Sequence, residues 1–505
     1  MSKTIIIIGA GLAGLSAALQ AAENGCNVKL VSSLPSERAQ SVMAEGGINA
    51  ALNTKDENDS PEEHFTDTIK AACGLADPNA VWGMTQAAPE LVHWLLKLGV
   101  KFNMSGYDDV DLRNFGGQKK KRTAFAQSDT GKQIMTAMID AVRRKEASGM
   151  VERFSHHSFL TLRLCGNICC GCVIRDEYSQ ETVELPGDAV IVATGGMHGL
   201  FGNTTGSLSN TGEVTAELFR LGVPLANGEM IQYHPTTVKC GGKRMLISEA
   251  ARGEGGRLFA MKDGKQWYFM EEKYPELGNL MPRDITAREI WKVSHESEVF
   301  LDMTEISDEI ISNKLSGLAD DCMTYLHKDI RKEPVSVLPG IHYFMGGILV
   351  DEQHRTPIQN LYAAGECCAQ YHGANRLGGN SLLGALYGGR VAAKSACEQA
   401  DVVDLSCATQ IDFPPASQIS EIKQLNKVMQ ETMGVVRNEN TLLNGIQTVQ
   451  ALTGNLPLLG MAVLKSALAR KESRGAHWRE DYPKSNDDDY LKTTVARFDG
   501  KQIQI

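Results

Sequence analysis

The sequence predicts an α/β fold with a Rossmann-like dinucleotide-binding domain, an inserted α+β capping domain and a C-terminal helical domain. Three observations predict it. A glycine-rich strand–helix–strand pattern opens the chain, buried-strand patterns recur near residues 188–197 and 361–368, and apolar residues recur at helical spacing after residue 420. The length of 505 residues fits about two to four domains.

The N-terminal element is a predicted strand at residues 4–8, followed at once by Gly9, Gly11 and Gly14 and by a helix with apolar residues on one face. Gly9 permits the tight turn, Gly11 lets the backbone approach a pyrophosphate, and Gly14 lets the helix pack closely. The second strand, residues 27–31, ends in Ser32 and Ser33 instead of the usual acidic residue. The pattern therefore predicts a dinucleotide site without choosing between NAD and FAD.

Two later segments favour FAD. Residues 188–197 read as a buried strand that ends in a glycine pair, and LYAAGE follows near residue 361. A first βαβ unit, an ATGG strand and a late LYAAGE strand are the parts of a flavoprotein fold, in which both ends of one domain hold FAD. Glu366 is then expected to bond a ribityl or ribose hydroxyl.

The charge and composition exclude other classes. The net charge of −10 argues against a general nucleic-acid binder, whose surface would be basic. No apolar run approaches the roughly 20 residues of a membrane span. The chain begins directly with a strand pattern and without the pattern of a signal peptide, so we expect a cytoplasmic protein; any association with a membrane would be through partner subunits.

The twelve cysteines include a cluster, LCGNICCGC, at residues 164–172. A metal site there would need four converging thiolates. The surrounding sequence instead reads as two strands joined at a Gly-Asn turn, followed by a third strand. We therefore predict buried thiols in a β-meander and no metal.

Five short segments place charged and imidazole side chains beside Gly or Pro: QYHPTT, ISEAARGEGG, MPRDITARE, IHYFMGG and HGANRLGGNSLLGA. Together they supply three arginines, three histidines and Glu249. Arginine forks fit carboxylates in bidentate geometry. The set predicts a site for a dianionic acid.

These motifs, in this order, make the chain resemble the flavoprotein subunits of fumarate reductase and succinate dehydrogenase, with L-aspartate oxidase as a relative. The resemblance covers nearly the whole chain. It implies that Arg283 protonates the substrate carbon, that Glu249 and Arg252 relay the proton with Gln232 close by, and that four residues grip the carboxylates: His234, Ser248, His342 and Arg376. Twisting one carboxylate out of conjugation would activate the alkene.

The resemblance also implies the residues that surround FAD and the substrate. We expect the substrate to contact Gly47, Phe115 and Phe125. The expected FAD-binding residues are Gly9, Gly11, Ala13, Gly14, Ser32, Ser33, Gln40, Ser41, Ala44, Glu45, Gly46, Thr194, Gly195, Glu213, Glu366, Asn380, Ser381 and Leu382.

The choice within this family depends on Phe115. In L-aspartate oxidase a glutamate stands there and pairs with the substrate ammonium group; an apolar ring offers no such partner. We therefore expect fumarate reduction, with aspartate oxidation or reduction of a related unsaturated acid as alternatives. PRDITARE and LYAAGE have some resemblance to the oxidase.

The residue expected to carry a covalent flavin is absent. The family pattern places a histidine five residues before Glu45, and this chain has Gln40 there, with Ser41 in place of threonine. Glutamine has no nucleophilic nitrogen for the link, so we expect FAD to be bound non-covalently. Loss of the link lowers the flavin potential, which favours reduction of an alkene.

The electron donor is not evident. No haem motif or ferredoxin-like domain is present. The resemblance implies a separate iron–sulfur subunit, and a soluble donor or dioxygen is the alternative. A flavin-bearing assembly subunit without turnover would show damaged site residues, and these are intact. Residues 119–122, KKKR, read as a solvated loop or as a surface that steers an anionic substrate.

The domain boundaries follow from the motifs. We expect the FAD-binding domain at residues 1–230 and 341–405, and the capping domain at 231–340. A C-terminal helical domain with a polar tail is expected at 410–505. After FPPAS at residues 413–417, apolar residues recur at helical spacing, and we predict that they form core: Ile422, Leu425, Val428, Met429 and Met433.

Overall fold

The computed structural model describes residues 2–106, 108–401, 411, 413 and 418–505. Its central sheet has five strands in the order β20-β10-β1-β2-β6, all parallel. The strands are β1 (Thr4–Ile8), β2 (Asn27–Ser32), β6 (Val151–Ser155), β10 (Ala189–Val192) and β20 (Leu361–Ala363). The predicted α/β fold class is confirmed, and β10 and β20 are the two later strands that the sequence indicated.

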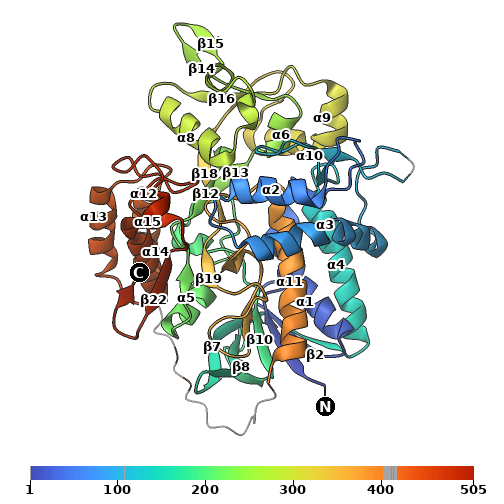
Figure 1. Ribbon diagram of the computed structural model, residues 1–505, viewed down its shortest axis with the longest axis vertical. Coiled ribbons are helices and arrows are strands. Elements are labelled where there is room, and N and C mark those ends of the chain that lie inside the picture. The colour runs from blue at the N-terminus through green and yellow to red at the C-terminus, as the bar shows by residue number, and fades with distance from the viewer. Residues whose placement is uncertain (1, 107, 402–410, 412, 414–417) are drawn as a thin grey trace.

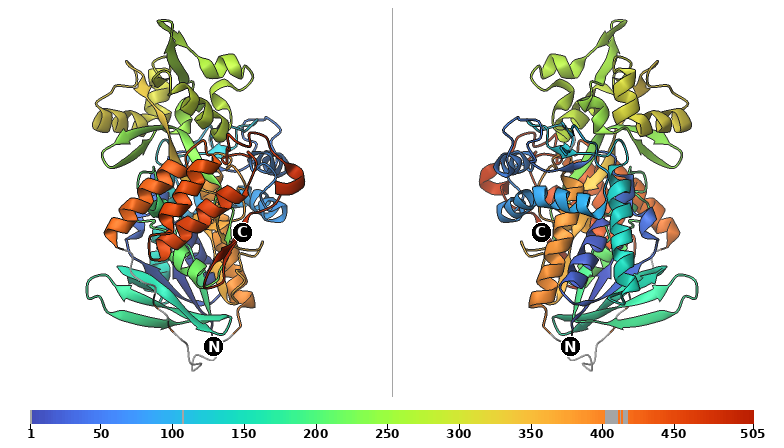
Figure 2. Two further views of the ribbon diagram at one scale, coloured as in Figure 1. Left: turned by 90° about the vertical axis from the view of Figure 1, so that its left-hand side faces the viewer. Right: turned by 90° about the vertical axis from the view of Figure 1, so that its right-hand side faces the viewer.

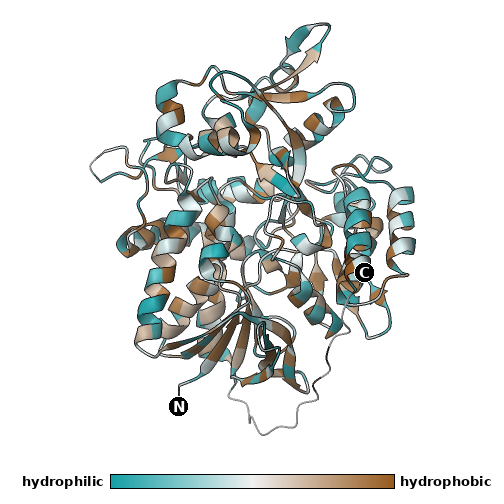
Figure 3. Cartoon of the chain, turned by 180° about the vertical axis from the view of Figure 1, so that it is seen from behind, coloured by the Kyte–Doolittle hydropathy of each residue, from teal (hydrophilic) through white to brown (hydrophobic). Residues whose placement is uncertain are grey.

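The strand β1 is apolar on both faces because each face is covered. Ile5 and Ile7 pack against α1 (Leu12–Glu23), α4 (Thr130–Ala147) and α11 (Asn380–Gln399). Ile6 and Ile8 pack against a three-stranded antiparallel sheet of β7 (His157–Cys165), β8 (Ile168–Asp176) and β9 (Thr182–Pro186). Figure 2 shows this layering from the side, and the hydropathy colouring of Figure 3 shows the apolar strands at its centre.

The cysteine cluster lies in this β7–β8 hairpin, as predicted. Cys169, Cys170 and Cys172 are buried free thiols, as expected. The prediction of a buried thiol is wrong for Cys165, which is half-buried and disulfide-bonded. Within the described ranges no group of three or more His, Cys, Asp or Glu side chains is arranged to hold a metal ion. The cluster is part of the protein core.

The capping segment forms the upper part of Figure 1. One sheet has the order β13-β12-β18, from β12 (Ile231–Cys240), β13 (Lys243–Leu246) and β18 (Leu338–Phe344). A second sheet joins β14 (Arg257–Lys262), β15 (Lys265–Trp267), β16 (Val299–Asp302) and β17 (Val335–Ser336). The short helix α6 (Glu249–Gly253) and the helix α8 (Arg283–Val293) carry charged motif residues toward the domain below.

The main helices of the C-terminal unit are α12 (Ile419–Thr432), α13 (Glu439–Val449) and α14 (Asn455–Ala469), and a short helix, α15 (Asp487–Tyr490), follows them. The predicted apolar stripe packs into one cluster with Leu200, Phe201 and Phe344 of the preceding domains, so it is core. The FPPAS segment and the predicted boundary at residues 405–410 lie outside the described residues, apart from Phe413.

Two sequence interpretations differ from the structure. The polar tail contains a strand, β22 (Val495–Phe498), which pairs antiparallel with β11 (Leu225–Ala226) because its apolar residues face the core. In the KKKR segment, Arg122 is fully buried between Asp59 and Asp67, at 2.8 and 2.9 Å. The prediction of a solvated loop is therefore wrong for Arg122. None of the described helices has the length and apolar character of a bilayer crossing.

Candidate active site

A cavity of about 570 Å³ runs from the carboxyl ends of the central strands to the cap. It brings together residues from both ends of the chain. The predicted site residues that line it are Gly9, Gly11, Ala13, Ser32, Ser33, Gln40, Ser41, Ala44, Glu45, Gly46, Gly47, Phe115, Thr194, Gly195, Glu213, His234, Ser248, Glu249, Arg283, His342, Glu366, Arg376, Ser381 and Leu382.

One end of the cavity is a glycine loop. Gly9 has a φ of +111°, and a side chain there would come within 2.3 Å of the Ala193 carbonyl oxygen. Gly14 does not line the cavity, but a side chain there would come within 1.8 Å of the Gly9 carbonyl, so it sets the close packing of the loop on α1. The N-terminus of α1 faces the cavity, and its N-cap residue, Gly11, has no side chain to cap the helix. The Leu12 amide donates a hydrogen bond to the Ser41 hydroxyl at 3.3 Å. Such a helix end is suited to bind a pyrophosphate.

Several polar atoms along this part of the cavity lack a protein partner. The buried Ser32 hydroxyl and one carboxylate oxygen of Glu45 have none. Burial raises the pKa of Glu366 to about 7, and its carboxylate accepts a hydrogen bond from the Phe344 amide at 3.1 Å. A ligand with hydroxyl and amide groups would complete these hydrogen bonds.

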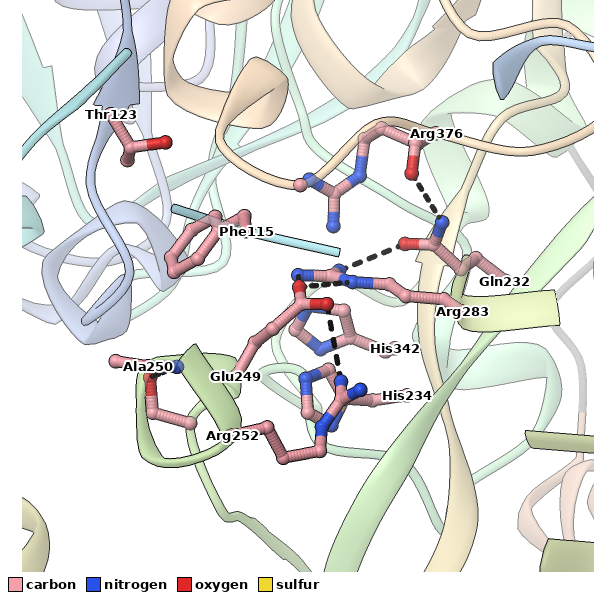
Figure 4. A network of polar contacts seen from close by, with 12 residues as sticks. Phe115, Thr123, Gln232, His234, Glu249, Ala250, Arg252, Arg283, His342 and Arg376 are labelled. Carbon is pink, nitrogen blue, oxygen red and sulfur yellow. Dashed lines mark hydrogen bonds and ion pairs between the residues drawn. The ribbon is translucent and has the colours of Figure 1, made fainter. Parts of the chain in front are cut away.

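The other end holds a cation–carboxylate cluster (Figure 4). Arg283 donates to one oxygen of Glu249 through Nε at 2.8 Å and Nη2 at 2.6 Å. Arg252 donates to the other oxygen at 3.1 Å. Burial acts to raise the pKa of Glu249, but the two guanidinium groups outweigh it and hold that pKa below its usual value. The carboxylate is therefore ionised and links two arginines.

Gln232 fixes this cluster from behind, outside the cavity lining. Its carbonyl oxygen accepts from Arg283 Nη1 at 3.0 Å, and its amide donates to the Arg376 carbonyl at 2.8 Å. Arg252, which also lies behind the lining, donates to the Asn279 carbonyl at 2.6 Å. Both residues position groups that reach the cavity.

Two histidines and a third arginine complete the site. The rings of His234 and His342 meet edge to face at 5.1 Å, and Thr205 bonds His342 Nδ1 at 2.8 Å. Burial, with nearby cations, holds the pKa of both histidines well below 6.5, so both are neutral. Burial lowers the pKa of Arg376 to about 9, and its buried Nε has no partner. Figure 4 shows Arg376 and Arg283 pointing into the same space.

The comparisons with known proteins agree with this geometry. The model for an FAD binding domain matches residues 4–382, and the model for the fumarate reductase flavoprotein C-terminus matches residues 453–505. The succinate dehydrogenase flavoprotein subunit of Bacillus subtilis is 39% identical, over 98% of this chain and 94% of that protein. The chain belongs to the succinate dehydrogenase and fumarate reductase flavoprotein family.

Two further similarities span the chain. The 8-methylmenaquinol:fumarate reductase flavoprotein subunit of Wolinella succinogenes is 32% identical, over 99% of this chain and 89% of that protein. The solved E. coli quinol fumarate reductase chain has a TM-score of 0.90 at 26% identity and covers 100% of this chain and 96% of that one. The family uses FAD to oxidise or reduce CH–CH groups, and the glycine loop and unpaired polar atoms described above fit that cofactor.

Two residues that the resemblance assigns to the site, Phe125 and Asn380, do not line the cavity. Phe125 is fully buried under the Arg113 guanidinium at 4.0 Å and does not line the cavity. Asn380 turns away from the cavity because its amide bonds Asn49, His64 and Thr68. Phe115, in contrast, lines the cavity and packs on Gly46, where a side chain would come within 2.8 Å of its ring.

Among the lining residues that the sequence interpretation missed are Tyr343, Lys243 and Arg244. Tyr343 lies under the Arg376 guanidinium, with 4.3 Å between them. It could have been noticed because it adjoins His342 in the HYFMGG motif. Lys243 and Arg244 also line the cavity, and only the β12–β13 hairpin brings them there.

Proposed function

We propose that this chain is the flavoprotein of a fumarate reductase and that Arg283 is the proton donor. The observation that carries the proposal is the position of Arg283. Arg283 is 6% exposed; its guanidinium reaches the cavity and donates hydrogen bonds to the ionised carboxylate of Glu249. An arginine held in this way faces the substrate as a hydrogen-bond donor with a carboxylate beside it.

The substrate would be held by charge. Arg376, His234, His342 and Ser248 line the same part of the cavity and provide donors for two carboxylates. The neutral histidines donate hydrogen bonds without adding charge, and the arginines neutralise the dianion. Gripping one carboxylate out of the alkene plane would make the alkene more electrophilic.

The reaction needs one hydride and one proton. When bound and reduced by two electrons from the donor protein, FAD would supply the hydride and return to its oxidised form. Arg283 gives a proton to the other alkene carbon, and a proton passing along Arg252 and Glu249 restores the guanidinium. Because arginine has a very high pKa, this transfer depends on the adjacent carboxylate receiving and returning the proton.

Reduction is the proposed direction because of Gln40. It lines the cavity on a short turn, Gln40–Met43, next to the glycine loop. Its side chain cannot form a covalent bond to the flavin, so we propose non-covalent FAD with a lower potential. A lower flavin potential disfavours succinate oxidation.

Fumarate is preferred over aspartate because of Phe115. A bound ammonium group near this ring would be buried without a partner, which costs several kcal/mol. L-Aspartate and related unsaturated acids remain the alternative substrates. Several relatives are named as subunits. We propose that a separate iron–sulfur protein supplies electrons to this chain and that any association with a membrane is through partner subunits.

The test is a pair of assays on the purified chain. One assay follows the oxidation of a reduced dye by fumarate, and the other follows the reduction of an oxidised dye by succinate. We expect the rate with fumarate to be the higher of the two. Turnover of aspartate without turnover of fumarate or succinate would overturn the proposal. Arg283→Lys should remove almost all turnover while FAD stays bound, and retained activity would exclude Arg283 as the acid.

A further inference from the structure

The hairpin of β12 and β13 brings two further cations to the cavity. Lys243 and Arg244 line the same space as Arg283 and Arg376. The hairpin turns at Gly241 and Gly242, and its first strand carries His234 of the inner site. The two ends of the hairpin therefore contact different depths of one cavity.

Arg244 is held in a defined position. Its Nε donates to the Thr237 hydroxyl at 2.5 Å and its Nη2 to the Leu338 carbonyl at 3.3 Å. A side chain on Gly340 would lie 2.6 Å from Arg244 Nε. The guanidinium thus crosses β12 and rests on β18 above a glycine, two residues before His342.

The charge of Arg244 is not neutralised. Among the described residues, neither Arg244 nor Lys243 forms an ion pair, and Arg244 donates hydrogen bonds to neutral oxygens of Thr237 and Leu338. Arg283 and Arg252, in contrast, share Glu249. A fixed cation without a carboxylate is available to an anionic ligand.

The solvent exposure of the cationic side chains increases from the inner end of the cavity to its mouth. Arg376 is 2% exposed and Arg283 is 6% exposed, Arg244 is half-buried, and Lys243 is exposed. At the inner end, the buried Nε of Arg376 has no partner. The cations therefore extend from solvent to the point where the substrate is expected to react.

We infer that Arg244, with Lys243 beside it, forms an outer anion-binding position that a dicarboxylate occupies before it reaches Arg283 and Arg376. This inference rests on the proposed function only for the class of the substrate, which is a small dianion. Arg244 acts on capture and release of the acid, because a cation at the entrance concentrates and orients an anion. It takes no part in hydride or proton transfer.

The test compares Arg244→Gln with Lys239→Gln. Lys239 is the cross-strand neighbour of Arg244, carries the same charge, is exposed and does not line the cavity. Binding of malonate, a dianion that does not react, is followed by the change in flavin absorbance. Arg244→Gln should raise the malonate Kd and the substrate KM about tenfold, with kcat within about twofold. Lys239→Gln should change neither by more than about twofold.

Further variants guard against a folding defect. Flavin content and melting temperature are measured for each protein. Arg244→Lys should recover most of the affinity, and Lys243→Gln should weaken binding in the same direction by a smaller factor. The dependence of kcat/KM on salt should be less steep in Arg244→Gln than in the unmodified chain.

Three results would overturn the inference: an unchanged malonate Kd in a folded Arg244→Gln, an equal loss in Lys239→Gln, or a loss in kcat with KM unchanged. The malonate measurement needs no turnover. A chain that does not reduce fumarate, yet loses malonate affinity in Arg244→Gln alone, would contradict the proposed function and support the outer anion position.

Discussion

Arg283 and Glu249 are joined through a single carboxylate oxygen, which accepts from Nε at 2.8 Å and from Nη2 at 2.6 Å of the same guanidinium. The other oxygen of Glu249 is engaged by Arg252 at 3.1 Å. One carboxylate therefore has a separate oxygen for each arginine, and a proton moving between the two arginines would pass through it.

We expect Glu249→Gln to lower kcat by about 10²- to 10⁴-fold, because an amide cannot accept and return a proton. Flavin content should stay unchanged. Glu289→Gln is the matched control, since Glu289 lies on α8 with Arg283 but pairs with Lys273 and Lys292 outside the cavity. Steady-state turnover near the wild-type rate in Glu249→Gln would exclude Glu249 as a relay.

Replacing Phe115 with Glu should weaken dicarboxylate binding. A carboxylate in this cavity would repel the dianion, and we expect KM for fumarate to rise by about tenfold or more. Phe115→Leu, which keeps an apolar wall, should change KM far less. Equal KM values for the two variants would show that Phe115 does not face the substrate.

Acid precipitation of the purified protein should release all flavin into the supernatant, because Gln40 cannot form the covalent link. The absorbance of supernatant and redissolved pellet measures the partition. Apo-protein mixed with free FAD gives the background for trapped cofactor. Flavin colour that persists in the washed pellet would contradict a non-covalent site.

The carboxyl of Glu45 should make a contribution to stability that is lost as pH rises. Burial raises the pKa of Glu45 from 4.5 to about 8. Between these values the folded chain holds a proton that the unfolded chain has lost, so this contribution to the free energy of unfolding decreases with rising pH until about pH 8.

Glu45→Gln removes this titration and should flatten the slope of melting temperature between pH 5 and 8, measured with saturating FAD. Glu431→Gln is the comparison, at an exposed residue outside the cavity. A slope unchanged by Glu45→Gln would mean that this carboxyl is not protonated in the folded chain.

Much of the fold and the site was predictable from local patterns. The glycine loop and the apolar strands define β1, α1 and β2 because backbone conformation and burial there depend on nearby residues. The motif around Arg283 indicated a charged cluster. Its partners could be named only through the family resemblance, because Glu249 is 34 residues away and no local pattern relates the two.

Contacts that depend on packing were not predictable. Asn380 and Phe125 carry suitable motif neighbours, yet hydrogen bonds to Asn49 and stacking under Arg113 turn them from the cavity. Arg122 follows three lysines in sequence but is buried because two aspartates from an earlier segment enclose it. In each case a partner distant in sequence decides where the side chain lies.

The arrangement of strands has a consequence for synthesis on the ribosome. The first strand of the central sheet in the sequence is β1, but the same sheet also needs β20, residues 361–363. The strand β11 pairs with β22, residues 495–498. A nascent chain therefore lacks one wall of the flavin cavity until more than two thirds of it has been made. Flavin uptake must come late, and a truncated product would expose the apolar edge of β10 to misfolding instead of holding its cofactor.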